Sequence, residues 1–182
     1  TPVKSDSRLY IWQGDITTLK CDAIVNACNS QMLGCFSPMH ACIDNFIHTY
    51  AGVELRLKMH EIMTKQGHEE ETGKAKITSG YNLPAKYVLH TVGPIIQWKV
   101  TQEDENLLAS CYKECLKLAA DTGVESIAFC CLSTGVFRFP QQRAAEIATE
   151  TVMQFLKKDD RIKKVIFNVF KNEDLEIYSH LL

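Results

Sequence analysis

The feature that most constrains the fold is the alternation of short apolar segments with longer segments that have a helical repeat. Residues 22–26 form an almost continuous apolar run, as expected for a buried strand of a parallel sheet. Residues 108–119 and 144–156 instead carry apolar side chains at helical spacing, which predicts helices with one buried face. Strands that alternate with helices favour a mixed, largely parallel sheet covered on both faces. We therefore predict an α/β protein, a three-layer α/β/α sandwich that receives ligands at the carboxyl ends of its strands.

The same patterns assign the other elements. Residues 51–65 are predicted to form a helix, and Pro38 predicts the start of another helix directly after it. Residues 67–73 are expected to form an acidic loop. Further strands are predicted at residues 9–13, 75–78, 87–91, 126–131 and 164–169.

Length and composition limit the class of protein. A chain of 182 residues with 46% hydrophobic composition suits one domain, residues 1–182, with a frayed start at residues 1–7. A net charge of -2 argues against a nucleic-acid partner, and no apolar run approaches the roughly 20 residues that span a bilayer. Eight cysteines without a leading secretory segment indicate reduced thiols. We expect a soluble, cytoplasmic monomer that binds neither nucleic acid nor membranes.

Cys35, His40 and Cys42 place two thiols and one imidazole within a short stretch of chain. Sulfur and nitrogen ligands together suit zinc, and three ligands without an evident fourth are typical of a catalytic site with an open position. Two alternatives stay open. The residues could be small buried hydrophobes of a cysteine-rich chain, or they could hold a purely structural zinc.

Residues 130–140 contain a strand, a glycine-containing turn and then a proline near the start of a helix. Backbone N–H groups of such a turn can converge on a diphosphate. Gly135 allows close approach, Ser133 or Thr134 adds a hydroxyl, and Phe137 could pack against a sugar or a base. The alternative is an ordinary connection in which Ser or Thr caps the helix.

Asp15 and Asn29 follow the first two predicted strands. The Asp15 carboxylate could accept hydrogen bonds from an adenine amino group, and the Asn29 amide could donate to and accept from ribose hydroxyls. Each has a structural alternative, since Asp15 could cap a turn and Asn29 could form one.

Four short motifs together resemble the macrodomain family, in that family's order. The resemblance covers nearly all of the chain from Leu9 onward. Within the family, the residues from Gln31 to Asn45 look like the zinc-dependent microbial macrodomains that remove mono-ADP-ribose from proteins. The four motifs are Gly14-Asp15-Ile16-Thr17, Asn26-Ala27-Cys28-Asn29, Thr91-Val92-Gly93-Pro94 and Ser133-Thr134-Gly135.

The resemblance assigns roles to residues at the matching positions. Asp15 and Ile16 would hold the adenine, and Asn29 would face the distal ribose and take part in catalysis. Asp44, in a segment similar to one that carries a catalytic aspartate in other hydrolytic macrodomains, becomes a second catalytic candidate beside a surface or capping alternative. The diphosphate and ribose would be wrapped by Ser133, Thr134, Gly135, Val136 and Phe137, and the zinc ligands would be Cys35, His40 and Cys42, of which Cys35 also borders the ligand.

The resemblance therefore implies a Zn²⁺-dependent hydrolase that acts on mono-ADP-ribosylated proteins, with esters of Asp or Glu as the expected linkage. A reader module that binds ADP-ribose without cleaving it is the alternative. The resemblance also suggests a functional link to a sirtuin-like ADP-ribosyltransferase. Cys28, Val136 and Arg138 depart from the common pattern, which concerns ligand preference more than fold. His48 and His90 are left outside the site, with His90 interpreted as a structural histidine.

Overall fold

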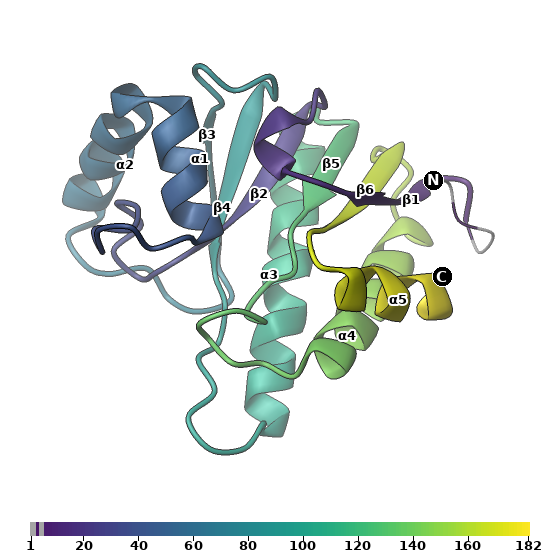
Figure 1. Ribbon diagram of the computed structural model, residues 1–182. Coiled ribbons are helices and arrows are strands. Elements are labelled where there is room, and N and C mark those ends of the chain that lie inside the picture. The colour runs from purple at the N-terminus through teal and green to yellow at the C-terminus, as the bar shows by residue number, and fades with distance from the viewer. Residues whose placement is uncertain (1–2, 4–5) are drawn as a thin grey trace.

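The computed structural model describes residue 3 and residues 6–182, which form one six-stranded sheet with helices packed against it (Figure 1). The strand order is β1-β6-β5-β2-β4-β3, and every neighbouring pair is parallel except β3 with β4. The mixed, largely parallel sheet is thus confirmed. The strands are β1 (Leu9–Gln13), β2 (Ala23–Cys28), β3 (Ala75–Ser79), β4 (Tyr87–Val92), β5 (Ser126–Phe129) and β6 (Lys164–Val169).

Helices lie on both faces of this sheet, as the alternation along β4 shows. Successive side chains of a strand point to opposite faces. His90 of β4 faces His48 in α1, with ring centroids 6.2 Å apart, whereas the next residue, Thr91, interacts with Cys111 in α3. Figure 1 shows α1 and α2 as one group and α3, α4 and α5 as another. The helices are η1 (Ile16–Thr18), α1 (Ile43–Ala51), α2 (Val53–Gln66), α3 (Gln102–Asp121), α4 (Gln141–Leu156) and α5 (Asn172–Leu181).

The local sequence explains where α3 and α4 begin. Thr101 and Asp104 form a reciprocal capping box at the start of α3, where each side chain bonds the backbone of the other. Pro140 stands at the N-cap of α4, directly before the first helical residue. The predicted apolar stripes face the core, because Leu108, Cys111 and most of the other stripe residues of both helices are buried.

Two expectations about helices and strands are wrong, and one helix was missed. No helix starts after Pro38, because Met39 has a φ of 61°, in the left-handed region that an α-helix excludes, and α1 begins only at Ile43. Strand β5 ends at Phe129, so Cys130 and Cys131 lie in the following loop. Helix α5 was not predicted. Pro38 therefore marks an irregular segment and not a helix N-terminus.

The core is formed by buried aliphatic side chains of the central strands, among them Ile24, Leu89 and Val165. Within the described part of the chain, no helix is both long and apolar enough to cross a membrane. The expected frayed segment lies partly outside the described residues; of its described part, Val3 donates a backbone hydrogen bond to Leu9.

All predicted site residues come after the carboxyl ends of β1, β2 and β5.

Candidate active site

The loop from Gly34 to Cys42 brings the three expected metal ligands together. Cys35 Sγ lies 3.2 Å from His40 Nδ1, and the ligand atoms of Cys35, His40 and Cys42 all lie within 4.8 Å of one another. Among the described residues, no other group of three such side chains has this arrangement. Two sulfurs and one nitrogen at this spacing fit zinc with one open position. The predicted cluster therefore exists as a geometric site.

The thiols of this cluster differ in their electrostatic surroundings. The hydrogen bond with His40 lowers the pKa of the Cys35 thiol, which favours the thiolate form that binds metals. Burial raises the pKa of the Cys42 thiol. Both thiols are only half-buried, as a site that exchanges ligands with solvent requires.

Packing against α1 and α2 holds this loop in place. Gly34 has a φ of 88°, and a Cβ atom there would lie 2.9 Å from His48 Cγ, so glycine is required where the loop crosses α1. The Arg56 guanidinium lies 4.7 Å from the centre of the Phe36 ring. The Asn45 amide donates a 3.0 Å hydrogen bond to the His40 carbonyl. Loop and helix thus form one unit.

Asn29 shapes the turn that leads into this loop. Its side-chain oxygen accepts hydrogen bonds of 3.1 Å from the backbone N–H groups of Gln31 and Met32, and its amide nitrogen lies 3.3 Å from the Gly34 carbonyl. The turn-forming alternative is therefore seen directly. Its role toward ribose stays a prediction, and the turn places Asn29 beside the segment that carries Cys35.

Asp44 is buried in the first turn of α1, with 4% of its surface exposed. Its Oδ1 accepts a 2.8 Å hydrogen bond from Asn26 Nδ2 and lies 3.6 Å from His48 Nε2. Burial raises the Asp44 pKa to about 6, although the Asn26 bond and Arg56 lower it. The surface or capping alternative for Asp44 is thus wrong: the side chain points inward, and the N-cap of α1 is Cys42.

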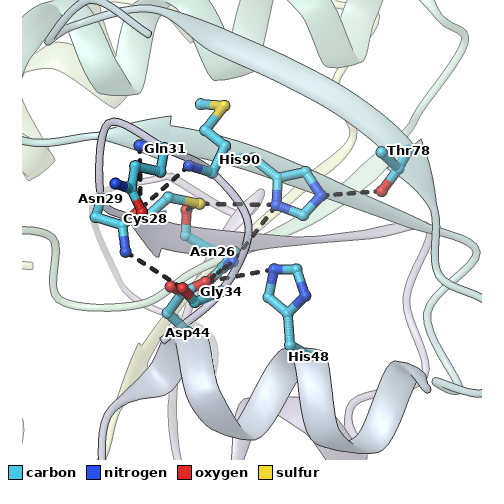
Figure 2. Close-up of polar contacts among 10 residues, drawn as sticks. Asn26, Cys28, Asn29, Gln31, Gly34, Asp44, His48, Thr78 and His90 are labelled. Carbon is cyan, nitrogen blue, oxygen red and sulfur yellow. Dashed lines mark hydrogen bonds and ion pairs between the residues drawn. The ribbon is translucent and has the colours of Figure 1, made fainter. Parts of the chain in front are cut away.

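Sequence reasoning missed the polar residues around Asp44 (Figure 2). Burial lowers the pKa of His48 to about 4 and that of His90 to about 3, so both rings are neutral near pH 7 and the 3.6 Å contact of His48 with Asp44 is not an ion pair. Asn26 could have revealed these residues from the sequence, because an amide in the middle of an apolar strand is a buried polar side chain that needs partners.

The loop after β5 presents unpaired donors. Among the described residues, no backbone N–H group from 133 to 137 donates a hydrogen bond to another part of the chain. The Ser133 hydroxyl is buried without a partner, and Ser133 has a φ of 63°. Unsatisfied donors and a strained backbone are expected where a ligand completes the site. This loop fits an anion such as a diphosphate.

The other residues of this loop have distinct surroundings. Thr134 Oγ1 donates a 3.1 Å hydrogen bond to the Cys131 carbonyl, so its hydroxyl supports the turn. A Cβ atom at Gly135 would meet nothing within 4 Å, which leaves open space at the loop surface. Val136 is 63% exposed and Phe137 half-buried. Arg138 has a φ of 62°, in the left-handed region that favours glycine.

Asp15 follows β1 and caps η1. Its Oδ1 accepts hydrogen bonds from the Thr17 backbone N–H at 3.0 Å and from the Thr17 hydroxyl at 2.7 Å. The capping alternative for Asp15 is therefore realised, and the carboxylate is also exposed. Ile16 is buried, so its side chain belongs to the core at this end of the sheet.

Together, the loops at the carboxyl ends of the strands carry an exposed carboxylate after β1, unpaired backbone donors after β5, and a Cys/His cluster with a buried carboxylate after β2. Because the carboxyl ends of parallel strands share one edge, these groups are suited to one elongated, anionic ligand with a reactive group near the cluster.

Comparison with known proteins gives consistent matches. The Macro domain family matches residues 25–148. A Treponema medium protein named Protein-ADP-ribose hydrolase is 61% identical over 173 residues, which cover 95% of this chain and 66% of that protein. A Fusarium oxysporum f. sp. cubense protein named Probable bifunctional ADP-ribose hydrolase/ADP-ribosyltransferase is 47% identical, over 97% of this chain and 31% of its own length.

A solved structure gives the same result in three dimensions. The Trypanosoma brucei macrodomain in complex with ADP-ribose superposes with a TM-score of 0.82 at 34% identity, and the match covers 96% of this chain and 69% of that one. The chain described here spans about two thirds of the length of the Treponema relative.

Proposed function

This chain belongs to the Macro domain family, and we propose that it is a zinc-dependent hydrolase that releases mono-ADP-ribose from modified proteins. The observation that carries the proposal is the cluster of Cys35, His40 and Cys42, which lies on the loop between Asn29 and Asp44. The printed name of the Treponema relative supports hydrolysis as the reaction. Since that relative is longer, the activity of the whole protein is part of the proposal.

ADP-ribose is the proposed ligand, as the Trypanosoma complex supports. The exposed Asp15 carboxylate would accept a hydrogen bond from the adenine amino group, through lone pairs that the cap leaves available. The N–H groups of residues 133–137 and the Ser133 hydroxyl would bind the diphosphate. Asn29 would then face the distal ribose. This order leaves the bond to the modified protein near the Cys/His cluster.

Cys35, His40 and Cys42 would hold the zinc ion, and three protein ligands are the number that catalytic zinc sites commonly have. When bound there, zinc supplies a Lewis acid that polarises a ligand oxygen. The packing of Gly34 on His48 and the bond from Asn45 to His40 fix the ligands before substrate arrives. Preorganised ligands of this kind reduce the cost of reaching the reactive geometry.

Asp44 is the proposed catalytic carboxylate, held by Asn26 at the start of α1. The proposed linkage is an ester of Asp or Glu, because a carboxylate is a good leaving group. Water forms a new bond to the ribose carbon as the bond from that carbon to the ester oxygen breaks, so the protein carboxylate leaves with the bonding electron pair. The products are the protein carboxylate, ADP-ribose with a free hydroxyl group and a proton from the attacking water.

We place the reaction in the reversal of a modification made by a sirtuin-like ADP-ribosyltransferase, and we place the protein in the cytoplasm. The bifunctional name of the Fusarium relative supports the link, since it joins a hydrolase and a transferase in one protein. The modified target would be identified by the protein that accumulates ADP-ribose when this activity is lost.

The decisive experiment measures ADP-ribose released from proteins that carry it on glutamate, on serine or on arginine. It compares the untreated protein, the chelator-treated protein and Cys42→Ala. Cys21→Ala is the matched control. Cys21 is also half-buried, but it precedes β2 and so lies at the amino ends of the strands, opposite the site.

The expected result is release from glutamate that is lost with the metal and in Cys42→Ala but is retained in Cys21→Ala. Binding of ADP-ribose with no metal-dependent release from any substrate would contradict the hydrolase and favour the reader module. Release from serine or arginine alone would retain the hydrolase and overturn the ester linkage.

A further inference from the structure

We propose that Thr78 and His90 are positioning residues for Asp44, because together they keep a hydrogen-bond acceptor beside the side-chain amide of Asn26, and Asn26 in turn holds the Asp44 carboxylate. The inference rests on the catalytic role that the proposed function gives to Asp44. It assigns a function to a buried group of side chains that no predicted ligand contact uses.

These four side chains form a continuous line of contacts through the layer between the sheet and α1 (Figure 2). Thr78 Oγ1 in β3 lies 2.9 Å from His90 Nε2 in β4. His90 Nδ1 lies 3.4 Å from Asn26 Nδ2 in β2, and Asn26 Nδ2 donates to Asp44 Oδ1 at 2.8 Å. All four are at most 6% exposed, so solvent does not offer them alternative partners.

The orientation of the Asn26 amide follows from its neighbours. Its nitrogen lies beside two acceptors, the Asp44 carboxylate and His90 Nδ1. If the amide were flipped, its oxygen would face the Asp44 carboxylate oxygen at 2.8 Å, and that contact would be repulsive, so the carboxylate alone fixes the amide. This orientation also points the amide nitrogen at His90 Nδ1, which suits it only while Nδ1 remains an acceptor.

The tautomer of His90 is fixed in the same way. Nδ1 faces the Asn26 amide nitrogen, which donates, whereas Nε2 faces the Thr78 hydroxyl, which can accept. The ring proton therefore belongs on Nε2. Burial lowers the His90 pKa to about 3, which keeps the ring neutral. The Cys28 thiol lies 3.7 Å from Nδ1 and donates to the Asn26 backbone carbonyl at 3.6 Å, so it packs beside the ring without supplying its proton.

Loss of the Thr78 hydroxyl would act on Asp44 through this line. The Nε2–H group would be buried without an acceptor, which favours transfer of the ring proton to Nδ1. Nδ1–H would then face the Asn26 amide nitrogen and repel it, which would weaken its hydrogen bond to Asp44. Thr78 and His90 are 6% and 0% exposed and lie away from the predicted ligand contacts, so ADP-ribose affinity should not change.

The test compares Thr78→Val with Thr78→Ser, because valine keeps the shape and serine keeps the hydroxyl. Thr149→Val is the matched control: Thr149 is also buried, and its hydroxyl bonds the Ala145 carbonyl in α4, on the other side of the molecule. The readouts are kcat and KM for release of ADP-ribose, Kd for free ADP-ribose, and the ¹⁵N spectrum of the His90 ring, which distinguishes the tautomers. Asp44→Asn is measured alongside.

For Thr78→Val we expect kcat to fall about three- to tenfold, the range that loss of one hydrogen bond produces, with Kd unchanged. The His90 ring should move toward the Nδ1–H tautomer. Thr78→Ser and Thr149→Val should keep kcat, and Thr78→Ser should keep the tautomer.

The inference alone is overturned if Asp44→Asn is inactive while Thr78→Val keeps its kcat, or if Thr149→Val loses as much. An Nδ1–H tautomer in the unmodified protein would also overturn it. An Asp44→Asn variant with full activity would instead remove the catalytic carboxylate from the proposed function, and this inference with it.

Discussion

Gly93, directly after β4, and Ser133, in the loop after β5, approach so closely that a Cβ atom at Gly93 would overlap with Ser133 Oγ. The Ser133 hydroxyl is buried against this glycine and has no partner among the described residues. The missing side chain at position 93 therefore keeps the hydroxyl in its place within the loop proposed to bind diphosphate.

Gly93→Ala should weaken ADP-ribose binding by displacing this hydroxyl. Because a serine side chain can rotate away, we expect the fold to survive and Kd to rise about three- to tenfold, the effect of one lost hydrogen bond. Isothermal titration calorimetry with free ADP-ribose measures the change.

A double-mutant cycle tests the cause. In the Ser133→Ala background the overlapping oxygen is absent, so adding Gly93→Ala should cost clearly less affinity than it does in the unmodified protein. Additive losses would show that Gly93→Ala acts elsewhere, for example through the path of the chain after β4.

Much of the fold was predictable because its signals are local. Apolar runs gave all six strands, and β1 and β6 were predicted at their observed bounds. The predicted helix after Pro38 was wrong because a proline fits several irregular conformations, and the left-handed backbone of Met39 leaves no local trace in the sequence. Helix α5 carries Leu175, Tyr178 and Leu181 at helical spacing and packs them against the core, so its signal was present in the sequence but was overlooked.

The site was predictable only in part. Cys35, His40 and Cys42 are neighbours in sequence, so their grouping could be anticipated from spacing. Asn26, which holds Asp44, and His90, which lies beside Asn26, come from separate strands, and no spacing rule links them; only the register of β2 with β4, which pairs these two residues, brings them together. Long-range pairing is information that short motifs do not contain.

Asp15→Asn should separate the two roles of Asp15. Asparagine keeps a side-chain oxygen for the Thr17 cap, so the free energy of unfolding should change by less than about 0.5 kcal/mol. An exposed carboxylate accepts a stronger hydrogen bond from the adenine amino group than an amide does, so Kd for ADP-ribose should rise several-fold.

The purine analogue of ADP-ribose, in which a hydrogen atom replaces that amino group, is the control ligand. Its affinity should be the same for the unmodified protein and for Asp15→Asn. An equal loss for both ligands would mean that Asp15 acts only through the shape of η1.

Metal removal should abolish hydrolysis without unfolding the domain. The loop that carries the cluster packs on α1 and α2 but adds few buried side chains to the core, with Phe36 at 61% and Met39 at 97% exposure, so the sheet and helices should keep their structure without the metal. We expect about one zinc per chain in the unmodified protein, and a chelated protein with an unchanged circular dichroism spectrum and cooperative unfolding.

Cys35→Ala should bind little zinc, because it removes the thiol whose pKa His40 lowers. Metal analysis under thiol-protecting conditions measures this. A chelated protein that loses its secondary structure would indicate a structural zinc site instead.

Asp22→Asn should destabilise the protein in a pH-dependent way. Asp22 precedes β2 and accepts hydrogen bonds from the Ser126 backbone and hydroxyl at 3.0 and 2.8 Å, and it pairs with Lys86 at 2.6 Å. Burial raises its pKa, but the bonds from Lys86, Ser126 and Glu125 outweigh burial and lower it to about 2, below the ordinary 3.8.

Because the folded pKa lies below the unfolded one, the unfolded chain binds more protons between pH 2 and pH 4, and stability rises with pH across this window. The stabilisation is complete above the unfolded pKa and is lost as the pH falls through about 2.

We expect Asp22→Asn to lower the free energy of unfolding by about 1–2 kcal/mol at pH 7, after allowance for partial exposure, and by progressively less toward pH 2. Urea unfolding across this pH range measures the difference. Lys86→Met is the control and should cost clearly less than Asp22→Asn does, because the Lys86 side chain is 71% exposed. A loss for Asp22→Asn that is the same at every pH would show that the carboxylate charge is not its source.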